Sequence, residues 1–347
     1  MARLAVALRA LVPALASVAI AACSVQHGLL PGSVSSGEGT AASRAVERTN
    51  LFVETASSVN EYDSRGHLVR KMTRGFQKVG INAGGLAFDS AGNLYAITGI
   101  HSISVYAASS RKLLRTITEG VEAPLALALD ARDDLYVGNM FSDTITVYPP
   151  GRSNPTVLIS QDINGSVDLA LDTSGNLYVA NYQGNSVTVY SPTGILIREV
   201  KNGVVSPDAI LLDSQDDLFV ANLGVRVGRS VKVYARNGDE PIQTIHRDVN
   251  NPGALALDRF GDLYVSNGGD VTGSARDAGG ATTVYDAARR RVLRILSGGG
   301  GPIAVDPTGN LYVPTDYHVD VYAPGSSKLL RTFGSGLVAH AMALGPP

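Results

Sequence analysis

The sequence predicts an all-β protein, a seven-bladed β-propeller with four antiparallel strands in each blade, and three observations support this fold class. One short pattern recurs along most of the 347 residues. The copies are spaced like propeller blades, which span about 40 to 45 residues for four strands. The chain also contains 38 Gly and no Trp. Such a composition suits many short strands joined by tight turns, because Gly adopts the positive φ angles that turns require.

The repeated pattern has four parts. An apolar run ends in Asp, a turn leads to Leu-Tyr, a loop leads to Val-Tyr, and a further apolar segment such as Leu113-Leu114 follows. Each part has the length and apolar content of a short strand. The Asp residues that end the first part lie 41 to 48 residues apart, at Asp89, Asp130, Asp172, Asp213, Asp258 and Asp306. The pattern therefore predicts six complete blades.

The two ends of the chain supply the parts of a seventh blade. Apolar segments at 51–53, 59–62 and 68–70 match the second, third and fourth strands of a blade, and 342–344 matches the first. We expect the closing blade to take its innermost strand from the C-terminus and its outer three strands from the N-terminus. This pairing would close the ring with hydrogen bonds and cover edges that an open sheet exposes.

The recurring polar residues are explained by the scaffold. In the turn that begins at Asp172, the Asp side chain can accept backbone N–H bonds, and Gly175 takes the left-handed conformation. The equivalent positions are Gly92, Asp133, Asp216, Gly261 and Gly309. Asp tolerates this conformation better than most residues, so the turn explains the Asp set without a ring of calcium sites. By the same reasoning Tyr136 and Tyr148 belong to the core, and the loops are capped by Asn139, Asn181, Asn222 and Asn267.

The N-terminus predicts export and lipid attachment. A basic start with Arg3 and Arg9 precedes an apolar stretch at 10–22 that is too short to span a bilayer. The run Ile20-Ala21-Ala22-Cys23 resembles the lipobox of bacterial lipoproteins. That resemblance implies cleavage before Cys23, attachment of acyl chains such as palmitate to it, and location at the bacterial cell envelope. The alternative is a cleaved secretory peptide with an incidental Cys.

Three regions follow from these observations. We expect a lipoprotein signal peptide at 1–22, a flexible tether rich in Gly, Ser and Ala at 23–49, and the propeller at 50–347. Cys23 is the single Cys, so the chain cannot form an intrachain disulfide. The formal net charge of −2 does not resemble the basic surface of a nucleic-acid binder. We expect a monomer that meets the membrane through lipidated Cys23 and binds a protein or a small molecule.

The clearest copy of the repeat, from Leu169 to Tyr190, resembles NHL repeats and the related YVTN-type propeller repeats. The resemblance covers nearly the whole mature chain and implies the propeller fold. Its relatives include ligand-binding sensor domains, protein-interaction platforms, lactonases and a lyase. The resemblance therefore carries no particular activity, because one fold hosts many functions.

Departures from the repeat are the places to look for function. Residues 223–229 and 268–280 lengthen the loop between the second and third strands in two neighbouring blades. Strands alternate in direction, so both loops would lie on one face of the disc, where long loops commonly bind partners. The charged residues there are Arg226, Arg229, Asp270, Arg276 and Asp277. A tolerated glycine-rich insertion is the competing interpretation.

A second departure lies just before the innermost strands, at the expected mouth of the central tunnel. Most residues there are Gly, Ala or Pro, but Asp168, Asp208 and His340 are titratable. His101, His318 and Glu54 belong to the same face in neighbouring blades, and with His340 they could bind an ion such as zinc. Loop and mouth differ in their distance from the axis, however. The sequence therefore requires no metal or other cofactor.

Two functions are compatible with these features. We favour a ligand- or protein-binding module at the cell envelope, which needs only a rigid disc on a tether. The alternative is a metal-dependent lactonase or lyase resembling the gluconolactonase-like propellers, which use acidic, Asn or His residues at the tunnel mouth. The glycine run 298–301 precedes a predicted strand rather than a helix, so it lacks the context of a phosphate-binding loop. These features are shared by enzymes and binding modules built on this fold.

Overall fold

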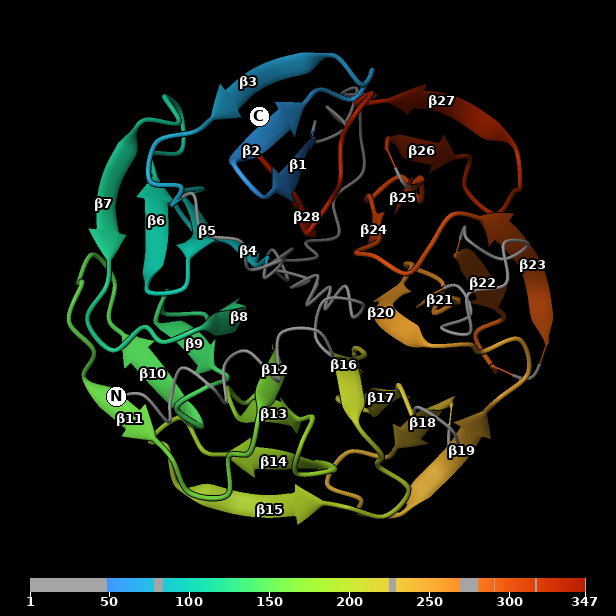
Figure 1. The fold of residues 1–347 in the computed structure, drawn as a ribbon. Coiled ribbons are helices and arrows are strands. Elements are labelled where there is room, and N and C mark those ends of the chain that lie inside the picture. The colour runs from blue at the N-terminus through green and yellow to red at the C-terminus, as the bar shows by residue number, and fades with distance from the viewer. Residues whose placement is uncertain are drawn as a thin grey trace, which may run out of the picture.

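The computed structural model describes residues 49–77, 84–224, 229–268, 280–289, 291–315 and 317–346. Over these residues the chain forms seven antiparallel sheets of four strands, arranged around one axis (Figure 1). The predicted seven-bladed β-propeller is therefore confirmed. The described ranges contain no helix that could cross a membrane.

The first three complete blades follow each other along the chain. The first blade consists of β4 (Leu86–Phe88), β5 (Leu94–Gly99), β6 (Ser102–Tyr106) and β7 (Leu113–Ile117). The second consists of β8 (Pro124–Leu129), β9 (Leu135–Asn139), β10 (Thr144–Tyr148) and β11 (Val157–Ile159). The third consists of β12 (Ser166–Leu171), β13 (Leu177–Asn181), β14 (Ser186–Tyr190) and β15 (Leu196–Val200).

The next three blades repeat this order from the axis outward. The fourth consists of β16 (Pro207–Leu212), β17 (Leu218–Asn222), β18 (Ser230–Tyr234) and β19 (Pro241–Ile245). The fifth consists of β20 (Pro252–Leu257), β21 (Leu263–Asn267), β22 (Ala281–Tyr285) and β23 (Val292–Ser297). The sixth consists of β24 (Ala304–Val305), β25 (Leu311–Pro314), β26 (Val319–Tyr322) and β27 (Leu329–Phe333).

The closing blade combines both ends of the chain, as predicted. Its strand order from the axis is β28 (Ala341–Gly345), β1 (Asn50–Thr55), β2 (Ser58–Tyr62) and β3 (Leu68–Met72). Phe52 of β1 pairs with Ala343 of β28, and five residue pairs join the two strands. The ring is therefore closed by backbone hydrogen bonds between segments nearly 300 residues apart.

The turns between first and second strands have the predicted geometry. In the third blade, Asp172 Oδ1 accepts the backbone N–H groups of Ser174 and Asn176 at 2.9 and 2.8 Å. Gly175 has a φ of 80°, and the equivalent Asp133 and Asp216 both have a φ of 63°. The Asp side chains thus hold the turns through their own carboxylates, which is the role that the sequence predicts for them.

The repeated Tyr residues lie in the core between blades, also as predicted. Tyr148 is almost fully buried, and its hydroxyl donates to the carbonyl of Glu119 at 2.6 Å. Tyr234 donates in the same way to the carbonyl of Asn202. Each ring adds buried apolar area, while the hydroxyl satisfies a carbonyl in the connection that leads into the same blade's innermost strand.

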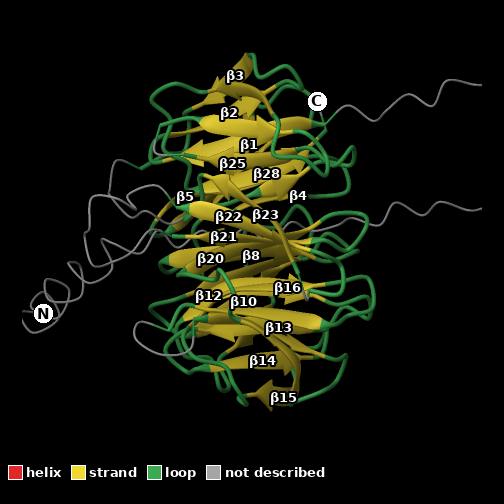
Figure 2. Cartoon of the chain, turned by 90° about the vertical axis from the view of Figure 1, so that its right-hand side faces the viewer, coloured by secondary structure: helices red, strands yellow, loops and turns green. Residues whose placement is uncertain are grey.

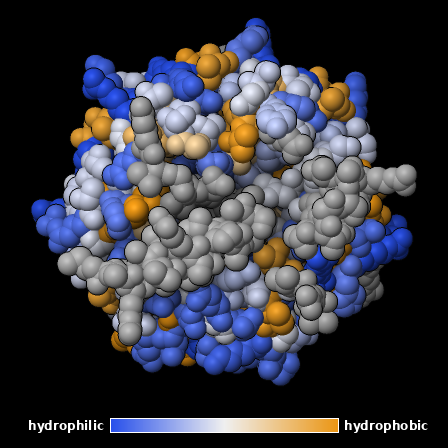
Figure 3. Space-filling model, viewed as in Figure 1, coloured by the Kyte–Doolittle hydropathy of each residue, from blue (hydrophilic) through white to orange (hydrophobic). Residues whose placement is uncertain are grey.

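The disc has two faces, which Figure 2 shows edge-on. We call the face with the Asp turns the turn face, and the opposite face, with the loops between second and third strands, the loop face. The innermost strands begin at the loop face because the connections between blades run there. Figure 1 looks onto the loop face, and Figure 3 shows that it is largely hydrophilic with small scattered apolar patches.

Candidate functional site

Of the charged residues predicted for the long loops, Arg229 lies within the described part of the chain. Its Nη1 donates to Oδ1 of Asn250, which is in the connection leading into the fifth blade. The backbone N–H of Asn250 in turn donates to Oδ1 of Asn267 at 2.8 Å. Arg229 therefore links the loop of one blade to the next. Outside the described residues are Arg226, Asp270, Arg276 and Asp277.

The four capping Asn residues have the predicted role. Asn139, Asn181 and Asn222 each accept, through Oδ1, a backbone N–H from the connection before their own blade, at 2.9 to 3.1 Å. Their amide groups donate to Ser or Thr side chains on the third strand, such as Thr188 at 2.9 Å from Asn181. The four Asn side chains thus stabilise the loops of the loop face. Because the side chains are buried, they present little polar surface to a partner.

Glu54 and His340 meet at the seam between the closing blade and the first blade. Glu54 is only 1% exposed, and its Oε2 accepts the backbone N–H of Gly85 at 3.0 Å. The backbone N–H of His340 donates to the carbonyl of Glu54 at 2.8 Å. Burial raises the pKa of the Glu54 carboxyl well above its ordinary value and lowers the pKa of the His340 imidazole. Both shifts favour the uncharged forms.

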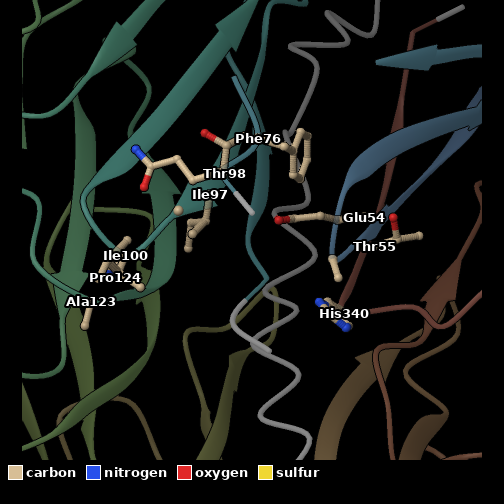
Figure 4. Close-up of a pocket in the computed structure, with 12 residues that line it drawn as sticks. Glu54, Thr55, Phe76, Ile97, Thr98, Ile100, Ala123, Pro124 and His340 are labelled. Carbon is tan, nitrogen blue, oxygen red and sulfur yellow. The ribbon is translucent and has the colours of Figure 1, made fainter. Parts of the chain in front are cut away.

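A small cavity opens beside these two side chains (Figure 4). Phe76, Ile97 and Pro124 supply apolar walls, and Glu54, Thr98 and His340 supply polar groups. The cavity volume is about 20 Å³, which is room for one water, since a water needs at least about 10 to 15 Å³. The cavity can hold one water or the tip of one side chain.

The other two residues predicted for the tunnel mouth lie elsewhere on the ring. Asp168 belongs to β12 and Asp208 to β16, and Figure 1 shows these strands across the axis from β28 and β1. Each Asp is 1% exposed. The structure therefore divides the predicted group into two pairs, one at the closing seam and one between the third and fourth blades.

Asp168 connects these two blades through its carboxylate. Oδ1 accepts the backbone N–H of Leu169, and Oδ2 accepts that of Ile210 in β16, both at 2.9 Å. Burial raises its pKa to about 7, although the two hydrogen bonds act in the opposite direction. The Asp168 carboxyl therefore lies against the strand that carries Asp208.

The carboxyl oxygens of Asp208 have fewer hydrogen-bond partners than those of Asp168. Its Oδ1 is buried, and no hydrogen-bond partner for it occurs in the described part of the chain. Burial raises the pKa of Asp208 to about 8, and the charge of Asp168 adds to this effect. The charge of Asp208 also helps burial to raise the pKa of Tyr182. Asp168, Asp208 and Tyr182 therefore form one electrostatic group.

The remaining His residues do not join either pair. His101 Nδ1 lies 3.3 Å from the carbonyl of Val121, and His318 Nε2 lies 3.3 Å from Asp320 Oδ1. Over the described ranges, no group of three or more His, Cys, Asp or Glu side chains is placed to hold a metal ion. Glu54, His101, His318 and His340 thus do not assemble into the set that a zinc site needs.

Sequence reasoning missed Tyr182. It follows Asn181 at the end of β13, where the equivalent positions are Met140, Leu223 and Gly268. The exchange of an apolar residue or Gly for Tyr in the third blade, one of the two blades that carry the buried Asp residues, was the available signal.

Comparison with known proteins supports the fold alone. No protein-family model matches the sequence, and no curated protein matches it. A solved structure of hydrazine synthase from Kuenenia stuttgartiensis is similar, with a TM-score of 0.64 and 16% identity over 79% of this chain and 93% of that chain. A functionally unknown protein from Desulfotomaculum acetoxidans is similar with a TM-score of 0.67 and 14% identity, over 86% and 99% of the two chains. The chain is thus a seven-bladed β-propeller.

Proposed function

We propose that this protein is a binding module of the bacterial cell envelope, held to a membrane by a lipid on Cys23 and recognising a protein partner with the loop face of its propeller. The lipobox-like run before Cys23 and the NHL- or YVTN-type repeat support the two halves of this proposal. The observation that carries it is the separation between the chain ends and the loop face.

Both ends of the described ring lie at the turn face. Asn50, which follows the proposed tether, pairs with Gly345 at the turn-face end of the closing blade. The carbonyl of Pro346 accepts a hydrogen bond from Arg111 at 2.5 Å, beside the turn that contains Gly92. A tether that leaves from the turn face keeps the loop face free for a partner.

The small size of the cavity at Glu54 and His340 favours a protein partner over a small molecule. Pockets for small molecules usually enclose about 300 to 1,000 Å³, whereas the cavity at Glu54 and His340 encloses about 20 Å³. Two large apolar or aromatic side chains of the same face are exposed, Val338 to 51% and Tyr317 to 66%. Leu337, next to Val338, donates its backbone N–H to the carbonyl of Tyr317 at 2.9 Å, so the segments that carry the two exposed side chains lie side by side.

Photo-crosslinking in intact cells tests the face. A photoreactive amino acid would replace Val338 on the loop face or, as the matched control, Phe260 on the turn face, which is 69% exposed. We expect a discrete crosslinked protein from position 338 and none from position 260. The same crosslinked protein from position 260 alone would contradict the proposal.

The anchor is tested separately. Cys23→Ala should move the protein from the detergent phase to the soluble fraction, because acyl chains contribute about 0.8 kcal/mol per buried methylene group. Full-length protein that stays in the membrane after this substitution would refute the lipid anchor.

Shortening 268–280 to the length of the third-blade loop should reduce crosslinking from position 338 while the melting temperature stays similar.

A further inference from the structure

The carboxyl pair between the third and fourth blades is not required by the fold. The repeat provides the comparison, because five of the blades place Ala or Pro, and one places Gly, where the third places Asp168. These residues are Gly85, Ala126, Ala209, Ala254, Pro302 and Ala341. The equivalents of Asp208 are Gly84, Leu125, Val167, Gly253, Gly301 and His340. The same strand geometry is therefore built elsewhere in the ring without a carboxyl group.

Keeping two carboxyl groups there costs stability. A buried polar group without a hydrogen-bond partner is unfavourable, and two buried carboxylates near each other add repulsion. Asp168 offsets part of its cost through the N–H groups of Leu169 and Ile210. Asp208 has no such compensation at Oδ1 within the described residues. A buried, unpartnered acceptor beside a second carboxyl is arranged to receive a hydrogen-bond donor that carries positive charge.

We propose that Asp168 and Asp208 form a binding site for a primary ammonium group, reached from the loop face where β12 and β16 begin. Asp208 Oδ1 accepts one N–H of the ammonium, and the Asp168 carboxylate accepts a second through a lone pair that its backbone donors leave free. The two carboxyl groups thus accept two of the three N–H donors of an ammonium group.

The donor set fits an ammonium group better than a metal ion. Calcium takes six to eight oxygen ligands, and zinc prefers His and Cys. The described residues bring only two carboxyl groups together here. An ammonium group also supplies the N–H donors that the unpartnered Oδ1 needs, which a metal ion would not.

The ammonium group can come from a free amine or from a Lys side chain or N-terminus of a protein. Both present the same –NH₃⁺ chemistry. The site does not depend on the partner proposed above, since a free amine would meet the same acceptors. Its test accordingly uses purified full-length protein and no partner.

Isothermal titration with methylammonium, at a pH above 8 where Asp208 is ionised, tests the site. Tetramethylammonium, which has no N–H donor, serves as the ligand control, and Ca²⁺ serves as the metal control. We expect methylammonium to bind, and Asp208→Asn to weaken this binding by at least about tenfold, as the loss of a charge-assisted hydrogen bond implies. Glu54→Gln is the matched protein control, because it alters a buried carboxyl across the ring and should leave the affinity unchanged.

A stability measurement distinguishes a functional carboxyl from a structural one. Asp208→Val introduces the residue that the third blade has at Val167, so it should raise the melting temperature while it abolishes methylammonium binding. If Asp208→Val fails to fold, Asp208→Asn still tests the site, because it keeps the shape of the side chain and removes its charge.

Several outcomes would overturn the site. The unaltered protein could fail to bind methylammonium, or it could bind tetramethylammonium equally well. Glu54→Gln could lose as much methylammonium affinity as Asp208→Asn does. Ca²⁺ could bind in place of the amine in a way that depends on Asp208. The peptide acetyl-Gly-Lys-Gly-amide identifies the source. Binding at least about tenfold tighter than methylammonium indicates a Lys side chain of a protein, and equal or weaker binding indicates a free amine; both results support the site.

Discussion

The guanidinium carbon of Arg111 lies 4.8 Å from the centroid of the Phe52 ring and joins the first blade to the closing blade. Arg111 is buried, donates to the carbonyls of Gly92 and Pro346, and lies 3.6 Å from the Glu61 carboxylate. One side chain thus contacts the N-terminal strands, the C-terminal segment and the first blade. It acts as a second closure of the ring beside the β28–β1 pairing.

Among the residues that the structure describes, the same contact occurs again between the fourth and fifth blades. Arg289 of the fifth blade lies over Phe219 of the fourth at 4.6 Å. In three blades that carry Tyr at this position, the Arg comes instead from the same blade, with Arg115 over Tyr95 at 5.7 Å, and Arg198 over Tyr178 and Arg294 over Tyr264 both at 5.8 Å. Where Phe replaces Tyr, the neighbouring blade therefore supplies the cation.

Substitution of Arg111 should weaken the ring strongly. Arg111→Ala leaves Glu61 buried with Asn50 as its remaining hydrogen-bond partner among the described residues, and breaking a buried ion pair costs about 3 to 5 kcal/mol. Arg289→Ala is the control, because Arg289 is 18% exposed and its partner Asp213 can be hydrated, so we expect a loss of about 1 to 2 kcal/mol. Urea denaturation measures both, and equal losses would show that Arg111 does not close the ring.

Asp216 should stabilise the contact between two blades as well as its own turn. Its carboxylate accepts the backbone N–H and the hydroxyl of Thr173 in the preceding blade, at 3.0 and 2.6 Å. Asp216→Gly keeps the positive φ but loses these bonds, which should cost about 1 to 2 kcal/mol. Asp216→Ala should cost about 1 kcal/mol more, because Ala is strained at a φ of 63°. An Ala variant as stable as the Gly variant in chemical denaturation would argue against this strain.

Removal of the last strand should open the ring. Deleting residues 341–347 removes β28 and with it Met342, which is 1% exposed. The loss should exceed about 3 kcal/mol, since truncation of one buried Met alone costs about 2 to 5 kcal/mol. Leu330→Ser on β27, at an exposed position, is the control and should change stability by less than about 0.5 kcal/mol. A deletion variant that melts with the control would refute closure by β28.

The sequence predicted the fold well because the repeat encodes it locally. The Asp turn at 172–176 and the apolar strands around it specify one blade, and copies of the blade stack into a ring with a split closing unit. The contact between Arg111 and Phe52 could not be predicted in this way. It joins an outer turn to a strand about 60 residues earlier, and its geometry depends on how adjacent blades pack.

The sequence singled out the residues of the candidate site, but it did not predict which of them lie close together. Asp168, Asp208, Glu54 and His340 stand out because the repeat has small or apolar residues at most equivalent positions. Their grouping depends on where each blade lies around the axis. The third and fourth blades bring Asp168 near Asp208, as its hydrogen bond to Ile210 shows. Glu54 on β1 and His340 next to β28 lie across the ring, because Figure 1 places these strands opposite β12 and β16. The unpartnered Oδ1 of Asp208 depends on side-chain geometry that a sequence does not contain.

The buried carboxyl groups predict how stability depends on pH. The pKa of Asp168 is raised to about 7 and that of Asp208 to about 8, from an ordinary value of 3.8, and the pKa of Glu54 is raised as well. The folded state therefore binds protons more tightly than the unfolded state. The stabilisation is fully present below pH 3.8 and is lost as the pH rises through the folded-state values.

The free energy of unfolding should accordingly fall between about pH 4 and pH 8, from the unfolded-state value to the folded-state values of the two Asp residues. Urea denaturation across this range measures the slope, and the double variant Asp168→Asn and Asp208→Asn should flatten it, because the amides do not titrate. Glu54→Gln should remove only the share that belongs to the closing seam. A slope that the double variant leaves unchanged would mean that other groups control the pH dependence. A free energy of unfolding that rises toward pH 8 would mean that the two Asp residues are ionised in the folded protein and held by a partner charge.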